Sequence, residues 1–81
     1  MRCFVYKSRK KAETYLYIPQ KGEFSSIPNV LMKVFGVPEF ALEFELTADR
    51  KLAVADAKDI IDYLGGQGFY LQMPSENDYP I

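Results

Sequence analysis

The sequence contains no histidine and only one cysteine, Cys3. Without histidine, neither a Ser-His-Asp nor a Cys-His catalytic arrangement can form. A single cysteine permits no disulfide within the chain, and too few ligands are present for a structural zinc site. The glycine patterns that cradle phosphate groups, GxGxxG and GxxxxGK followed by Ser or Thr, are also missing. From the residues we therefore expect no cofactor, no metal and no catalytic residue.

Long apolar runs are missing as well. None approaches the roughly 20 residues that a bilayer-crossing helix needs, and the first residues have the pattern of a strand instead of a signal peptide. With the lone cysteine, these features predict a cytoplasmic protein that has no membrane partner. The net charge of −1 gives the chain no overall attraction to nucleic acid.

The residues that are present predict one packed domain. The chain has 81 residues, of which 48% are hydrophobic and 15% aromatic, a composition typical of globular cores. We assign residues 1–74 to a single domain. Residues 75–81 are polar and contain a proline, so we expect them to form a loose C-terminal tail.

The clearest unit of the sequence spans residues 51–74. Asp56 is a candidate N-cap whose carboxylate can accept backbone N–H groups of the first helical turn. One apolar helix face follows, and then Gly65 or Gly66 can end the helix in the left-handed conformation. The face consists of Ala57, Ile60, Ile61 and Leu64. Residues 69–73 predict a strand with apolar groups on both faces, which we place inside the sheet, and Pro74 ends it.

Three more strands and one more helix precede this unit. Residues 3–7 and 14–18 predict two strands joined by a short polar link, which makes a hairpin. Residues 24–36 predict a helix with Ser25 or Ser26 as cap, Pro28 in its first turn and Gly36 as its stop. Its apolar face contains Ile27, Leu31, Val34 and Phe35.

Residues 39–46 alternate strictly between two sets of side chains. The alternation predicts a strand with one set on a core and the other in solvent. The core set is Phe40, Leu42, Phe44 and Leu46, and the solvent set is Glu39, Ala41, Glu43 and Glu45. The resulting order β-β-α-β-α-β predicts an α+β fold, a small layered α/β sandwich with a mostly antiparallel four-stranded sheet and two helices.

Five segments occur in a distinctive order: residues 3–8, 14–18, 27–38, 50–56 and 68–74, with FVYKS, TYLYI, FGVP, RKLA and GFYLQMP as their most distinctive runs. Together these segments resemble one known family, the YcgL family of small gamma-proteobacterial proteins. The resemblance covers residues 3–74. It implies a compact α/β/α sandwich and carries no established activity.

Two groups of side chains could still carry chemistry. Glu43 with Glu45, and Asp59 with Asp62, are spaced as paired carboxylates for acid–base work or magnesium. Their alternation with apolar residues is equally typical of a solvated face, which we favour. Cys3 lies near Arg2 and Lys7, as a reactive thiolate would. Its apolar strand favours core packing instead.

Basic residues gather in the first hairpin. Five of them precede the first acidic residue, Glu13. Basic groups beside exposed aromatic rings suit single-stranded nucleic acid, because phosphates meet cations and bases stack on rings. We favour the other interpretation, a solvated hairpin tip whose tyrosines are packed under a helix. The candidate binding surface consists of Tyr6, Lys7, Arg9, Lys10, Lys11, Tyr15, Tyr17 and Tyr70.

Three functions follow from these observations. The first is a small cytosolic interaction module with a protein partner and no catalysis. The second is RNA binding through the same hairpin. The third is a hydrolase or nuclease that uses carboxylates with a divalent metal.

Overall fold

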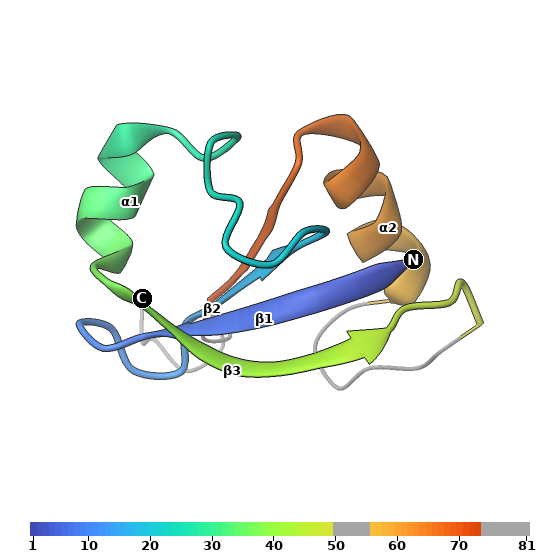
Figure 1. The fold of residues 1–81 in the computed structure, drawn as a ribbon, viewed down its shortest axis with the longest axis horizontal. Coiled ribbons are helices and arrows are strands. Elements are labelled where there is room, and N and C mark those ends of the chain that lie inside the picture. The colour runs from blue at the N-terminus through green and yellow to red at the C-terminus, as the bar shows by residue number, and fades with distance from the viewer. Residues whose placement is uncertain (50–55, 74–81) are drawn as a thin grey trace, which may run out of the picture.

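The structure is a computed structural model, and it describes residues 1–49 and 56–73 (Figure 1). The order of the elements is the predicted one. They are β1 (Arg2–Ser8), β2 (Tyr15–Ile18), α1 (Asn29–Phe35), β3 (Pro38–Glu45), α2 (Ala57–Gly66) and β4 (Tyr70–Gln72). The predicted lead into the second helix at residues 51–55, the stop at Pro74 and the tail at 75–81 lie outside the described residues.

The four strands form one sheet in the order β3-β1-β2-β4, and every neighbouring pair is antiparallel. The predicted α+β class is therefore confirmed. The inside position predicted for β4 is wrong, because β4 has β2 as its one neighbour and pairs with it over three residues. Its apolar residues on both faces reflect the layers that cover both sides of the sheet.

The two faces of the sheet belong to two separate cores. Because successive strand residues point to opposite faces, Cys3 and Val5 of β1 face one side and Tyr6 faces the other. The core on the α2 side consists of Cys3, Val5, Tyr17, Leu46, Ala57, Ile60 and Leu64. The core on the α1 side consists of Tyr6, Leu16, Ile18, Ile27, Phe35 and Phe69. The helices thus cover opposite faces, as the resemblance implied.

A β-bulge divides β3 into two halves. Val5 of β1 pairs with Leu42 while the next residue, Tyr6, pairs with Phe40, so Ala41 is the extra residue. The predicted common face of Phe40, Leu42, Phe44 and Leu46 is therefore wrong. Phe40 lies beside Tyr6 on the α1 side, with ring centroids 5.5 Å apart, whereas Phe44 packs on the α2 core. The predicted solvent set of β3 is exposed as expected, but Phe40 (42%) and Leu42 (49%), predicted in the core, are exposed as well.

Helix α1 begins later than predicted. Pro28 is its N-cap, no side chain caps it, and Ser25 and Ser26 lie in the turn before it. Gly36 ends the helix with φ of 85°, as the sequence predicts, and its N–H donates to the carbonyl oxygen of Met32. Val34, predicted in the core, is 46% exposed.

Helix α2 begins at the predicted place and ends later. Asp56 is the N-cap, but its backbone oxygen, not its carboxylate, accepts the N–H groups of Asp59 and Ile60. Gly65 and Gly66 lie inside the helix. The left-handed residue is Gly68 (φ 90°), whose N–H donates to the carbonyl oxygen of Tyr63.

Candidate interaction surface

The tyrosines of the predicted binding surface lie on two faces of the sheet. Tyr6 is buried on the α1 side, where its hydroxyl oxygen accepts the N–H of Gly22. Tyr17 is buried on the α2 side, and Tyr15 and Tyr70 pack half-buried against the same core. No single surface therefore presents all four rings to a ligand.

A row of tyrosine rings does form on the α2 side. The rings of Tyr17 and Tyr70 meet edge to face at 5.6 Å, and Tyr63 lies 5.2 Å from Tyr70. The Tyr17 hydroxyl donates to Gln72 at 2.5 Å, and burial raises its pKa to about 12. The sequence pattern did not single out Tyr63 as part of this row. Its position three residues after Ile60 nevertheless places it next to the buried face of the helix.

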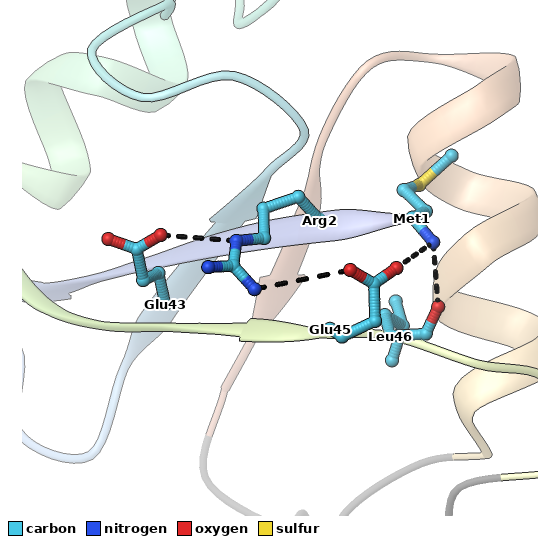
Figure 2. Close-up of polar contacts among 5 residues, drawn as sticks. All are labelled: Met1, Arg2, Glu43, Glu45 and Leu46. Atoms are coloured by element: carbon cyan, nitrogen blue, oxygen red, sulfur yellow. Dashed lines mark hydrogen bonds and ion pairs between the residues drawn. The ribbon is translucent and has the colours of Figure 1, made fainter.

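Two of the basic residues are paired with β3. The Arg2 guanidinium lies 3.2 Å from Glu43 and 4.0 Å from Glu45, as Figure 2 shows. In the same group the N-terminal amine lies 2.6 Å from Glu45 and donates to the carbonyl oxygen of Leu46. Lys7 lies 3.4 Å from Glu39. The cations of β1 thus offset the carboxylates of β3 rather than facing a ligand.

The remaining cations lie on the turn between β1 and β2. Ser8 shapes this turn, because its hydroxyl oxygen accepts the backbone N–H groups of Lys10 and Lys11. Arg9, Lys10 and Lys11 are exposed. In Figure 1 the turn lies at the same end of the molecule as α1 and far from α2.

Two contacts fix the turn against the C-terminal end of α1. The Ser8 hydroxyl donates to the carbonyl oxygen of Phe35 at 2.6 Å, and the Lys10 ammonium donates to that of Lys33 at 3.1 Å. A Cβ at Gly36 would lie only 2.5 Å from the Lys10 side chain, so the lysine stem crosses directly over this glycine. The basic turn and the helix therefore form one continuous surface.

Three exposed valines lie on the outward side of α1 and two residues beyond its end. Val30 is 76% exposed, Val34 46% and Val37 74%. Val30 and Val34 are one turn apart on the same side of α1, and Lys33 lies beside them toward its neighbouring face. Lys33 also lines a shallow depression of about 520 Å³ together with Asn29, Met32, Gly36, Val37 and Pro38.

We call this region the α1–turn surface, and define it by Arg9, Lys10, Lys11, Val30, Lys33, Val34 and Val37. Sequence reasoning found its turn but missed its valines. The missed signal is the composition of α1, since five of its seven residues are apolar. So short a helix packs only one side on the sheet, and it must leave some of its apolar residues in solvent.

The carboxylate pairs lie apart from this surface. Asp59 and Asp62 line an open depression of about 560 Å³ with Tyr63, Gly66 and Gln67. Within residues 1–49 and 56–73, no three Asp, Glu, Cys or His side chains gather as a metal site would require. Cys3 is fully buried, and burial raises the pKa of its thiol to about 11. Cys3 is therefore a core-packing residue and not a reactive thiolate.

The comparison with known proteins agrees with this fold. The pattern of the YcgL domain matches residues 3–75. The chain belongs to the YcgL family. One YcgL domain-containing protein, from Thioalkalivibrio sulfidiphilus, is 49% identical over the full length of both chains. A YcgL domain-containing protein of Aeromonas salmonicida is 51% identical over 74 residues, covering 91% of this chain and 80% of its own.

A third relative extends the family across more distant sequences. A YcgL domain-containing protein of Haemophilus influenzae is 40% identical over 78 residues, which cover 96% of this chain and 89% of that protein. These relatives are named for the domain alone. Neither helix described here has the length and apolarity needed to cross a bilayer.

Proposed function

We propose that this YcgL protein is a non-catalytic cytoplasmic interaction module that binds a protein partner through the α1–turn surface. The observation that carries the proposal is the exposure of Val30, Val34 and Val37 beside a cluster of cations. Aliphatic side chains left in solvent next to polar groups are typical of protein-binding surfaces.

RNA is the alternative partner, and the exposed cations of the turn support it. Base stacking would need open rings beside those cations. Tyr6 and Tyr17 are buried, and Tyr15 and Tyr70 lie on the side of the sheet opposite α1. The exposed apolar side chains of the α1–turn surface are valines, which offer no ring to a base, and the half-exposed ring of Phe40 on the same side has the Lys21 ammonium 4.6 Å over it. These positions favour a protein over RNA.

A carboxylate-dependent hydrolase ranks third. Asp59 and Asp62 lie on α2, whereas Glu43 lies on β3 and pairs with Arg2. A two-metal or acid–base mechanism needs carboxylates from different elements to converge on one cleft. Among the described residues, no three carboxylates converge on one place.

Site-specific photo-cross-linking in cells tests the proposed function. A photoreactive phenylalanine analogue placed at Val34 is expected to capture a protein, and the same analogue at the exposed Lys58 of α2 is the matched control. Adducts at position 34 that are no stronger than those at position 58 would overturn the proposal. Adducts that ribonuclease removes would replace it with the RNA alternative.

RNA binding has a separate test on the purified chain. Lys11→Glu is the suitable variant, because Lys10 is engaged with α1 and its loss would disturb the fold as well. On our proposal, the original chain binds single-stranded RNA weakly at physiological salt, and Lys11→Glu changes little. Tight binding that falls with salt and with Lys11→Glu would favour RNA.

A further inference from the structure

We infer that the α1–turn surface binds an acidic amphipathic helix of the partner protein. This inference rests on the proposed function and names the chemistry of the partner. The occupant presents aliphatic side chains to the valines and aspartate or glutamate side chains to the cations around them.

The charges of the surface select an acidic occupant. Its four charged side chains are Arg9, Lys10, Lys11 and Lys33, and α1 itself contains no acidic residue. Among the described residues, Arg9, Lys11 and Lys33 have no ion-pair partner, whereas Arg2 and Lys7 are paired with glutamates of β3. Glu13 is the one acidic side chain of the same turn. Among the described residues, three unpaired cations thus lie together at this end, where they steer an acidic segment into place.

The C-terminal turn of α1 does not oppose such a ligand. The free carbonyl groups at a helix C-terminus repel anions. Here the Lys10 ammonium is held 3.1 Å from the carbonyl oxygen of Lys33, and the Ser8 hydroxyl donates to that of Phe35. Both carbonyl groups are thus already satisfied by donors, and an acidic side chain can approach the turn.

The shape of the surface selects a helix over an extended strand. The surface consists of side chains from a helix and a turn, so it offers no row of free backbone groups to pair with a strand. A helical ligand brings its own backbone hydrogen bonds and needs only side-chain contacts. The exposed sheet edge at β3 is unsuitable for strand addition, because the bulge at Ala41 interrupts it and Glu39, Glu43 and Glu45 line it.

The exposed apolar side chains of the surface determine how many apolar residues of the ligand can pack against it. Val30 and Val34 form a ridge one turn long, and Lys33 separates it from the depression lined by Met32, Val37 and Pro38. One leucine or isoleucine of the ligand fills the depression, and a second, one helical turn away, packs on the ridge. With so few anchors, we expect a dissociation constant of about 0.1–1 mM for an isolated peptide.

A titration of the whole chain with two designed peptides tests the inference. Both peptides are helical and carry leucine at i and i+4, but one has glutamate at its flanking positions and the other has lysine. We expect the glutamate peptide to shift the amide NMR signals of residues 9–11 and 29–37, and the lysine peptide to leave them unchanged. We expect Lys33→Glu to weaken binding about tenfold, while Lys58→Glu on α2 leaves it unchanged.

Three results would overturn the inference. They are the absence of shifts in these two segments at about 2 mM glutamate peptide, equal shifts with the lysine peptide, and concentration-dependent shifts of the same signals without any peptide. The last would mean that a second copy of the chain occupies the surface. If the titration fails while position 34 still captures a protein in cells, the proposed function stands and only the acidic helix is wrong.

Discussion

The hydroxyl of Ser8 joins the first hairpin to the first helix by donating to the carbonyl oxygen of Phe35 across 2.6 Å. The same oxygen accepts two N–H groups of the turn, from Lys10 and Lys11. One small side chain thus satisfies three backbone groups from two segments that lie 27 residues apart. The position of the basic turn against α1 depends on it.

Ser8→Ala is therefore expected to destabilise the chain. Removing the hydroxyl leaves backbone groups without partners in a buried place, which costs about 1–3 kcal/mol of unfolding free energy. Equilibrium unfolding in urea measures the loss. Thr47→Ala, at an exposed position, is the control and should change stability by less than about 0.5 kcal/mol. Equal stabilities of the two variants would show that the Ser8 contact contributes nothing.

The rotation of α2 can be checked with two neighbouring residues. Ile60 is fully buried, whereas Ile61 packs only partly against the same core. We expect Ile60→Ala to cost about 2–5 kcal/mol of unfolding free energy and Ile61→Ala distinctly less. Urea unfolding of both variants measures the difference. A larger cost at Ile61 than at Ile60 would mean that α2 is turned by one residue.

Two glycines near the end of α2 are expected to respond in opposite ways to alanine. Gly65 lies inside the helix, and a Cβ there would meet nothing within 4 Å. Gly65→Ala should therefore raise stability by about 0.5–1 kcal/mol.

Gly68 has φ of 90°, and a Cβ there would lie 2.6 Å from the Cβ of Ser26. Gly68→Ala should lower stability by more than about 1 kcal/mol, because both the backbone and the neighbour must shift. Thermal unfolding of the two variants gives the comparison. A Gly65→Ala protein less stable than Gly68→Ala would contradict the end that the structure assigns to α2.

The buried acids on the α2 side predict a loss of stability in alkali. Burial raises the pKa of the Cys3 thiol from 9.0 to about 11 and that of the Tyr17 hydroxyl from 10.0 to about 12. As pH rises, the unfolded chain ionises first, so the unfolding free energy falls between about pH 9 and pH 12.

Urea unfolding at half-unit steps of pH measures this decline. In Cys3→Ala the unfolding free energy should no longer fall between about pH 9 and 10. The fall above about pH 10, which is due to Tyr17, should remain. Native Cys3 should also react slowly with a thiol reagent at pH 8 and quickly once the chain is unfolded. An unchanged slope in Cys3→Ala would show that another group titrates there.

Local patterns predicted the elements well. The alternation in β1 and β2 correctly places apolar groups on both faces, and the periodicity from Ala57 to Leu64 gives the buried side of α2. These properties depend on neighbours within one or two turns, which the sequence shows directly. The stop at Gly36 depends on a single backbone conformation and was predicted for the same reason.

Properties that depend on distant segments were not predicted. The edge position of β4 follows from which strand pairs with β2, and the bulge at Ala41 follows from the register of β3 against β1. The run of cations in the sequence does not become one patch in space, because Arg2 and Lys7 meet glutamates some 32 to 43 positions away. Only the cations of the α1–turn surface were predicted, because they are consecutive in the sequence. Its exposed valines could not be predicted, because their exposure depends on how α1 packs on the sheet.

The bulge at Ala41 changes the face of the sheet to which the side chains of β3 point. Before it, Phe40 points to the α1 side of the sheet, and after it, Leu42 pairs with Val5 on the α2 side. A single strand thereby directs its apolar side chains to both faces of the sheet, which a regular strand of the same sequence would not do. Loss or gain of one residue here would move every side chain in one half of β3 to the opposite face of the sheet. The length of this segment, more than its hydrophobicity, therefore determines which face of the sheet the side chains of each half of β3 occupy.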